Sequence, residues 1–443
     1  MSIKITRKSF LRGAAAVAAV PSAVWAKTPR KWYKGNMHTH TLVSDGRAFP
    51  TESALLYRDA GYNFVVFTDH NLVHNKENWV TEKNHRRKRF SEKNAKNFAK
   101  KYPAFRPQTR VEPDGTTAWR YGTFEETAAA VNKPGEFIVM SGCEYNDSIA
   151  NKHQLHCNVV NSFKAHKGAR CTTMMESFKN MHDSFRNLTV GEDAFFVVNH
   201  PFYWFYDVDP LILSDIDELR FFEINNAAAA DLPFKKLPEG AYDCDKLWDF
   251  ALAKRAMRGA PPIYALGTDD THYYGNLYRE VAGKRSTYGN HAFVGVAADE
   301  LSATGIVSAM RKGDFYASTG VEFADIRMDG ATLSVEVSKA LGKDCTIVFY
   351  GTKRDANLAY SPGEERSIAD FAAELEPRKP IPAYIGTHRR IPKLPADAGI
   401  VLAETKGKKA SYTLKSDDLY VRAKVISGEA VAWTQPLWHN VKK

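Results

Sequence analysis

The sequence predicts an α/β domain followed by a small antiparallel β domain. Between about residues 32 and 325, short apolar runs alternate with helical patterns, which is typical of a βα barrel or a parallel sheet. From about Phe323, alternating apolar and polar stretches lie between Gly, Pro and Asp turns. The third observation is that His, Asp and Glu residues recur at the ends of the apolar runs in the first domain.

The apolar runs and helical patterns define the expected elements. Candidate strands of the first domain are residues 36–41, 63–68, 136–141, 154–160, 194–199, 219–224, 263–267 and 292–296. Candidate helices are residues 51–60, 124–131, 246–258 and 303–312, and residues 71–123 form a long insertion. In the second domain we expect strands at residues 331–337, 345–350, 410–414 and 419–426, around a Pro-rich segment at 376–395. The predicted domains are residues 27–325 and 326–443.

Residues 1–26 have the composition of an export signal. A basic start precedes a small apolar stretch at residues 13–20, and Val24-Trp25-Ala26 fits a cleavage site before Lys27. Residues 6–12 resemble a twin-arginine signal with lysine in place of the second arginine, and the general secretory route could read the same segment. A membrane anchor or an amphipathic helix is the alternative interpretation. We expect an exported protein, periplasmic or secreted, with no transmembrane segment in the mature chain.

Composition narrows the class of protein. The chain has 443 residues with 44% hydrophobic and 25% charged residues, which is ordinary for a globular protein. Its five cysteines form no CxxC zinc pattern. Cys171 and Cys244 are candidates for a disulfide, whereas Cys143 and Cys157 are interpreted as small buried residues.

Positive charge is concentrated in the insertion. The net charge is +10, and residues 83–110 contain eleven Lys or Arg against one acid, Glu92. This segment is either a solvated helical face or mobile loop, or a cationic lid over a site that accepts phosphate. Because the sequence contains no nucleic-acid-binding motif, we expect no stable complex with nucleic acid.

Ligand-type side chains follow one predicted strand after another. His38 and His40 share a face of an extended segment, and Asp45 follows in a Ser-Asp-Gly turn. In a βα barrel, functional groups converge from the C-terminal ends of several strands. Imidazole with carboxylate suits zinc, manganese or iron, and nine ligands are too many for one ion. The predicted metal ligands are His38, His40, Asp45, His70, Glu144, His156, His200, Asp270 and His272.

Two further acids adjoin these ligands. Asp69 is a candidate for orienting a ligand histidine, with a strand-end cap as the alternative. Asp269 precedes Asp270 and should point away from the metals, because side chains alternate along a strand.

Residues 32–325 resemble the polymerase and histidinol phosphatase (PHP) domain family. The resemblance rests on the nine ligands in their motifs, with weaker similarity at residues 222–225 and 313–316. It implies a distorted (β/α)7 TIM-like barrel with up to three divalent metals. The implied ligand sets are His38, His40, Glu144 and Asp270 for one metal; Glu144, His156 and His200 for a second; and Asp45, His70 and His272 for the third. The C-terminal β domain resembles an appendage of exported members.

The resemblance also implies hydrolysis of phosphate esters. We expect a metal-dependent phosphoesterase in which a metal-bridging water attacks phosphorus, with Glu144, Asp270 and His272 in catalytic roles and Zn, Mn or Fe as metals. The partner would be a small phosphorylated substrate. Residues 202–206 form an aromatic run that suits a nucleotide-like molecule, with ordinary packing as the alternative. Monoesters, diesters and bisphosphates all stay open, as does the oligomeric state.

Two other functions fit parts of the pattern. An amidohydrolase also begins with His-x-His and hydrolyses C–N or lactone bonds, but it usually places a modified lysine at the position of Glu144. A metal-stabilised protein that binds the cell envelope without catalysis would need closed tetrahedral sites, which nine ligands around one cavity argue against.

Overall fold

The computed structural model describes residues 31–150, 152–153, 155–202, 207–228, 242–274, 290–340, 345–370 and 388–438. The predicted export signal, residues 203–206 of the aromatic run and residues 376–387 of the Pro-rich segment lie outside these ranges. Within the described ranges, no helix combines the length and apolar character needed to cross a bilayer.

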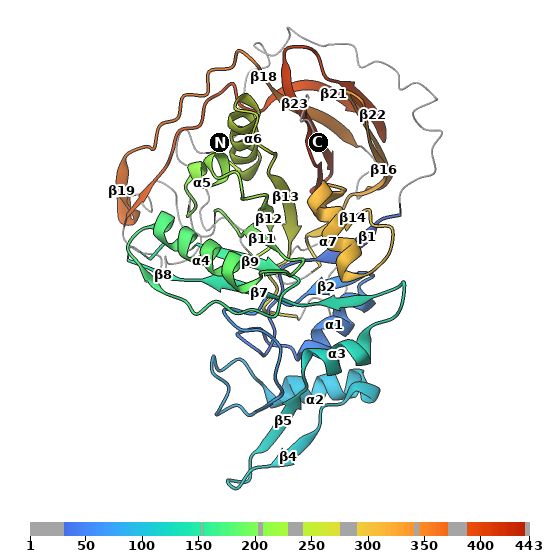
Figure 1. Ribbon diagram of the computed structural model, residues 1–443. Coiled ribbons are helices and arrows are strands. Elements are labelled where there is room, and N and C mark those ends of the chain that lie inside the picture. The colour runs from blue at the N-terminus through green and yellow to red at the C-terminus, as the bar shows by residue number, and fades with distance from the viewer. Residues whose placement is uncertain are drawn as a thin grey trace, which may run out of the picture.

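Two sheets carry the first part of the chain, and the mixed α/β character predicted from the sequence is confirmed (Figure 1). In the first sheet β14, β1, β2 and β6 lie side by side; in the second the order is β13-β12-β11-β9-β7. The strands of the first are β1 (Tyr33–Asn36), β2 (Phe64–Val66), β6 (Ile138–Met140) and β14 (Phe293–Val296). Those of the second are β7 (Gly142–Asn146), β9 (His156–Val160), β11 (Phe195–Val198), β12 (Phe221–Asn226) and β13 (Tyr264–Thr268).

The two sheets adjoin at two places. At one edge β6 runs into β7 across Ser141. At the second place β13, the edge strand of the second sheet, packs against β14 inside the first sheet. A Cβ at Gly267 would lie 3.0 Å from the Phe293 carbonyl oxygen, which is a tight contact, so glycine eases this approach. Among the described residues the strands pair as separate sheets and not as a closed barrel. Closure of the predicted barrel stays a prediction.

Helices pack around these sheets. Two predicted ranges agree with the structure, α3 (Phe124–Val131) and α7 (Ala303–Lys312), and two agree to within two residues, α1 (Pro50–Asp59) and α6 (Cys244–Met257). Local signals explain the agreement: Thr123 and Glu126 form a capping box at the start of α3, and Gly313 ends α7 in a left-handed conformation with φ 77°. The sequence did not predict α4 (Met174–Leu188) or α5 (Pro210–Asp215).

The first predicted strand is misplaced. The strand expected at residues 36–41 ends at Asn36, so that His38 and His40 follow it. The Asn36 side chain donates hydrogen bonds to His38 O (3.0 Å) and to Thr39 Oγ1 (2.6 Å), which turns the chain out of the sheet. Both histidines thus lie in a loop anchored by the Asn36 side chain.

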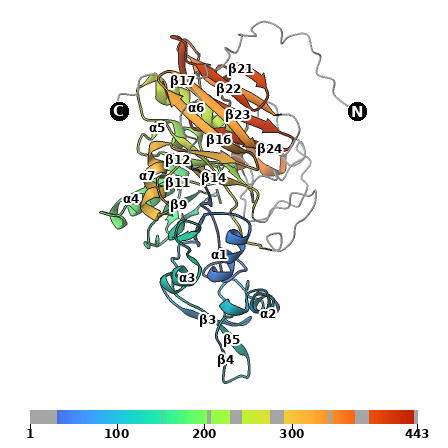
Figure 2. The ribbon, with the colours of Figure 1, turned by 90° about the vertical axis from the view of Figure 1, so that its right-hand side faces the viewer.

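The insertion projects from one end of the molecule (Figures 1 and 2). Phe49, just before α1, packs against Phe90 and Phe98, with ring centroids 6.1 Å and 5.6 Å away, which anchors the insertion to the start of α1. Its elements are β3 (Asn78–Val80), α2 (Glu92–Lys101), the 3-10 helix η2 (Pro103–Phe105), β4 (Thr109–Val111) and β5 (Thr117–Tyr121).

The C-terminal strands extend the first sheet. β15 (Phe315–Ser318) pairs with β14 on one side and with β24 (Ala430–Thr434) on the other. Antiparallel pairing continues through β23 (Asp418–Ser427), β18 (Thr346–Lys353) and β21 (Ile400–Lys406), and a three-stranded sheet contains β16 (Glu322–Asp329), β17 (Thr332–Lys339) and β22 (Lys409–Thr413). The short strands are β8 (Ser148–Ile149), β10 (Arg170–Cys171), β19 (Glu365–Ser367), β20 (His388–Arg390) and β25 (Leu437–Trp438).

Side chains also join the C-terminal strands to the second sheet. The Gln435 amide donates to Ala265 O (2.9 Å) and accepts from Ala265 N (3.0 Å), so that it caps the edge of β13 as a strand would. The buried Arg422 donates to both carboxylate oxygens of Asp249 on α6, at 2.8 Å and 2.5 Å. These contacts hold β13, which Asp270 follows, and the helix α6 against the C-terminal part.

Candidate metal centre

Glu144, at the middle of β7, is the hub of a cluster that contains the predicted ligands. Its Oε1 atom lies 3.2 Å from His38 Nε2, 3.2 Å from His156 Nδ1 and 3.4 Å from His200 Nε2. Its Oε2 atom lies 2.7 Å from His70 Nδ1 and 3.5 Å from His40 Nε2. The two oxygens of one buried carboxylate therefore face different groups of imidazoles.

Asp270 forms the second acidic point of the cluster. Its Oδ1 atom lies 3.3 Å from His38 Nε2, 3.1 Å from His40 Nε2 and 3.4 Å from His272 Nδ1. Asp270 follows β13 with φ 52°, and His200 follows β11 with φ 25°. Two ligand-type residues thus adopt the left-handed backbone region that side chains avoid, a strain that concentrates at functional sites.

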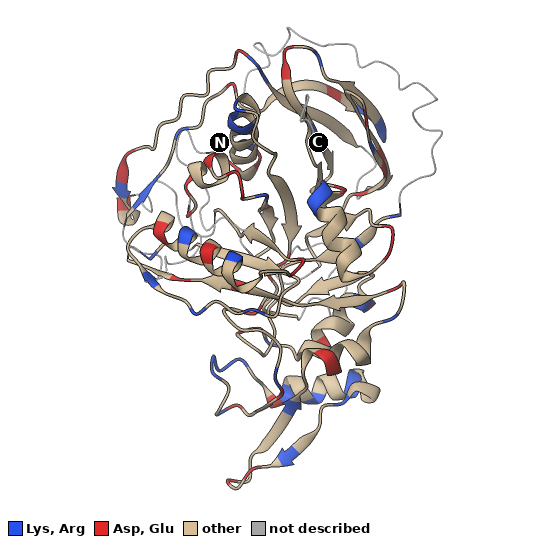
Figure 3. Ribbon diagram, in the orientation of Figure 1, with Lys and Arg blue, Asp and Glu red and all other residues tan. Residues whose placement is uncertain are grey.

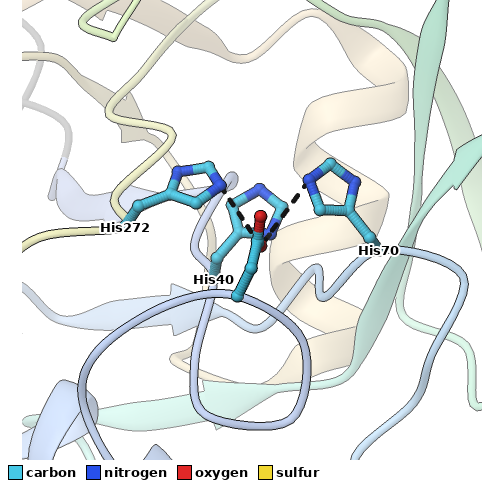
Figure 4. A group of neighbouring side chains, drawn as sticks. His40, His70 and His272 are labelled. Atoms are coloured by element: carbon cyan, nitrogen blue, oxygen red, sulfur yellow. Dashed lines mark ion pairs between the residues drawn. The ribbon is translucent and has the colours of Figure 1, made fainter. Parts of the chain in front are cut away.

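The third carboxylate, that of Asp45, lies at the open end. Its Oδ1 atom is 3.3 Å from His272 Nε2, and 3.7 Å from both His70 Nε2 and His40 Nδ1. Figure 4 shows the rings of His40, His70 and His272 converging from three separate segments. The side chain of His272 is 24% exposed, whereas that of His38 is fully buried, so the cluster opens on the Asp45 side.

Three groups within the described residues could each hold a cation, with ligand atoms within 4.8 Å of one another. The groups are His40, Asp45, His70 and His272; His38, His40 and Asp270; and His70, Glu144 and His156. His40 belongs to the first two groups and His70 to the first and the third. The sets implied by the family resemblance instead used Glu144 as the shared ligand.

The donor atoms of the cluster fit metal ions. Glu144 Oε2, Asp270 Oδ1 and His70 Nδ1 are buried and have no hydrogen-bond partner among the described residues, although they lie near one another. Buried polar atoms are normally paired, and nitrogen and carboxylate oxygen atoms that converge in this way are expected around a cation. Imidazole nitrogen and carboxylate oxygen are the ligands that zinc, manganese and iron accept.

The electrostatics keep the carboxylates ionised. Burial opposes ionisation, but the charges of His70, His156 and His38 hold the pKa of Glu144 well below its ordinary value. Burial likewise opposes ionisation of Asp270, whose pKa His38 and His40 hold well below the ordinary value. Both carboxylates are thus available as anionic ligands at neutral pH.

The pKa values of His40 and His272 are shifted in opposite directions by their surroundings. Burial, together with the charges of His272 and His70, lowers the pKa of His40 to about 3. Burial also acts on His272, but Asp45 and Asp270 raise its pKa to about 9. His40 is therefore a neutral ligand at pH 7, and in the metal-free protein His272 carries a proton that a metal would displace.

Glu223 orients the deepest ligand. Its Oε1 atom lies 2.7 Å from His38 Nδ1, and its Oε2 atom accepts from the backbone N–H of His200 at 2.7 Å. Asn226 donates to Glu223 Oε2 (2.9 Å) and to Asp270 Oδ2 (3.2 Å). The sequence pointed to Glu223 only through the weaker family similarity at residues 222–225 and assigned it no role, although a glutamate inside the apolar run of β12 was a further signal.

Asp69 shapes the loop that carries Asp45. It accepts hydrogen bonds from the backbone and hydroxyl of both Thr41 and Ser44, at 2.5–3.0 Å. Its predicted role toward a ligand histidine is indirect: Ser44 Oγ lies 3.5 Å from His40 Nδ1. Gly46 completes the turn, because a Cβ there would lie 2.1 Å from the His40 carbonyl oxygen.

Asp269 faces away from the cluster, as strand alternation predicts. Its carboxylate accepts from the Tyr57 hydroxyl (2.9 Å) and from the backbone N–H groups of residues 290, 291 and 292 at 2.7–2.9 Å. Cys171 and Cys244, the candidates for a disulfide, are free thiols in the structure, as are the other three cysteines. Cys143 and Cys157 are buried, as predicted.

Neither a protein-family model nor a curated protein matches the chain. Among solved structures, the chain is similar to a two-domain protein of Bacteroides vulgatus that contains a predicted PHP-like metal-dependent phosphoesterase, with TM-score 0.38 and 11% identity over 94% of each chain. A protein of Bifidobacterium adolescentis with a proposed metal-dependent phosphoesterase activity gives TM-score 0.26 and 12% identity, over 60% of this chain and 95% of that one. An amidohydrolase of Chromobacterium violaceum, with bound sulfate and no metal, gives TM-score 0.27 and 13% identity, over 54% of this chain and 88% of that one.

Proposed function

We propose that this protein hydrolyses phosphate esters at a multinuclear metal site. The observation that carries the proposal is the cluster itself, in which both oxygens of Glu144 face separate groups of imidazoles while Asp45 and Asp270 anchor its two other sides. The six histidines and three carboxylates are too many donors for one ion.

The residues of the cluster take different parts. Glu144 is the bridge, because each of its oxygens faces a different set of ring nitrogens. Glu223 holds His38 in one tautomer, with Nε2 directed at Glu144 and Asp270. The partly exposed Asp45 and His272 form the rim where substrate enters.

Metal ions held there would supply positive charge that polarises a phosphoryl group and acidifies water. The buried walls around His38 and Glu144 exclude bulk solvent, which strengthens these charges. Phosphoryl transfer needs positioning and charge stabilisation more than covalent chemistry, and the cluster offers both. Glu144 occupies the position where an amidohydrolase would usually carry a modified lysine, which favours the phosphoesterase.

Three further properties belong to the proposal. The two places at which the sheets adjoin, β6 to β7 and β13 to β14, support a distorted (β/α)7 barrel. Residues 1–26 would export the chain, and residues 326–443 would form a β-rich domain. Zinc, manganese and iron are all candidates for the metals, and the preferred substrate would be small and phosphorylated.

The test is phosphate and alcohol release by the protein from residue 27 onward, reconstituted separately with manganese, iron or zinc. The panel contains phosphomonoesters, phosphodiesters and bisphosphates beside amides and lactones. Metal-dependent cleavage of phosphoesters that Glu144→Gln abolishes is the expected result. Cleavage of amides or lactones alone would replace the proposal with an amidohydrolase, and inactivity on the whole panel in a metal-loaded protein would favour a binding protein.

A further inference from the structure

Two arginines from distant segments meet at the hydroxyl of Tyr273. Arg47 Nη2 donates to this oxygen at 3.3 Å, and Arg89 Nη1 donates to it at 3.4 Å. Arg47 follows the Ser-Asp-Gly turn, Arg89 belongs to the insertion, and Tyr273 follows the ligand-type residue His272. The Arg47 guanidinium also lies over the Tyr273 ring, 4.2 Å from its centroid.

Neither arginine has an acidic partner among the described residues. Across the described ranges, no carboxylate lies within 4.0 Å of either guanidinium, and the buried Nε atom of Arg89 has no hydrogen-bond partner there. Two like charges that share one neutral acceptor repel each other, and a guanidinium fork is suited to a planar or tetrahedral oxyanion. The two guanidinium groups can therefore offer N–H donors and positive charge to an anion.

Backbone contacts hold this arginine pair beside the open end of the metal cluster. Arg47 N donates to His272 O at 3.0 Å, and His272 is itself 3.3 Å from Asp45. His85 ties the insertion to the same loop: its Nε2 atom donates to Leu42 O at 3.0 Å, while its Nδ1 atom accepts from Arg89 N at 3.2 Å. The backbone of Arg89 is thus held against the loop that carries Asp45, by contacts that do not involve the guanidinium.

The structure separates Arg89 from the rest of the basic insertion. Lys and Arg residues are spread over α2 and the loop before it (Figure 3). Arg86, Arg87 and Lys88 are exposed, whereas Arg89 is half-buried against Tyr273. Diffuse positive charge would raise the local concentration of any anion, but only a fixed pair can recognise one group on a substrate.

We propose that Arg47, Arg89 and Tyr273 form a binding site for a second oxyanion of the substrate, a phosphate or a carboxylate, in addition to the phosphate ester that is cleaved. This inference rests on the proposed function, because it places the second group beside the open end of the same cluster. It selects substrates with two anionic groups over simple phosphomonoesters.

The kinetic test compares butyl phosphate, the phosphate ester of hydroxybutanoate and the bisphosphate of butanediol. For Arg89→Gln, the ratio of kcat/KM for the bisphosphate to that for butyl phosphate is expected to fall about tenfold. Arg86→Gln removes the same charge from an exposed position of the same loop and should leave the ratio unchanged. An unchanged ratio in Arg89→Gln, or an equal fall in both variants, overturns the inference. The carboxylate substrate shows which oxyanion is preferred.

A binding measurement separates this inference from the proposed function. Calorimetric titration of the metal-free protein with butanediol bisphosphate should show Kd weakened about tenfold in Arg89→Gln and unchanged in Arg86→Gln. Tyr273→Phe keeps both charges but removes the shared acceptor, and should weaken binding if the pair acts as a unit. Binding that depends on Arg89 without turnover of any ester would uphold the anion site and reject the phosphoesterase. Binding that does not depend on Arg89 would reject the anion site.

Discussion

At the scale of single residues, Glu144 is the carboxylate on which five histidines of the cluster converge. Removing its charge while keeping its shape leaves five histidines without the carboxylate that they share. Glu144→Gln is therefore expected to lose more than one metal ion per chain and more than about a hundredfold in activity. Metal analysis of the purified protein beside the rate measurement checks this. Full metal content with a near-normal rate would contradict the bridging role.

Glu223 acts through His38 and should affect metal affinity more than folding. Its carboxylate fixes the ring of His38 from the side opposite the cluster. Glu223→Gln is expected to weaken metal binding about 10- to 100-fold, measured by competition with a chelator. Glu218→Gln, at an exposed position ahead of the same strand, is the matched control and should bind metal normally. Equal affinities in the two variants would show that Glu223 has no such role.

At the scale of elements, His74 closes the insertion. Its Nε2 atom donates to Gly122 O at 2.7 Å, and its own carbonyl accepts from Phe124 N at 3.0 Å, which brings the two ends of the insertion together. Burial lowers the pKa of His74 to about 4 from 6.5. The unfolded chain therefore binds a proton in a pH range where the folded chain does not.

Because the folded chain resists protonation of His74, acid lowers the stability of the fold. The contribution of His74 to stability is fully present above about pH 6.5 and is lost as the pH falls toward 4. Between pH 7 and pH 5 this amounts to about 2 kcal/mol. His74→Gln keeps the donor and removes the titration, so urea unfolding should show a smaller loss of stability over that range than in the wild type. Parallel losses in both proteins would assign the pH dependence to other groups.

At the scale of the whole molecule, a buried ion pair joins the C-terminal strands to α6. Arg422 is fully buried and bonds Asp249 at 2.5–2.8 Å, with Asp245 at 3.0 Å from the same guanidinium. Asp249→Ala removes the closer partner and leaves a buried charge undercompensated, at an expected cost of about 3–5 kcal/mol in the free energy of unfolding.

The control for this prediction is an exposed ion pair in the same part of the chain. Lys339 Nζ lies 3.0 Å from Glu322 Oε1 with 62% of the lysine side chain exposed, so Lys339→Ala should cost less than about 1 kcal/mol. Urea unfolding followed by tryptophan fluorescence gives both values. Similar costs in the two variants would mean that the buried pair is no more important than a surface contact.

The sequence by itself determined the elements and residue types that have local causes. The bounds of α3 and α7 were predictable because a capping box and a terminal glycine act within a few residues. The ligand-type residues were predictable as a set because each follows or interrupts an apolar run, and the structure brings that set together around Glu144. The mixed α/β character followed from the same alternation.

Tertiary structure alone decided how these parts are combined. Asn36 ends the first strand early by bonding its own loop, and Gln435 caps β13 with a side-chain amide from 170 residues away. Glu223 meets His38 across 185 residues, and Arg89 meets Tyr273 across 184. Periodicity and capping report only near neighbours along the chain, whereas these contacts depend on which strands pair and which loops dock. The orientation of the ligands and the pairing of the two arginines therefore became visible only in the folded protein.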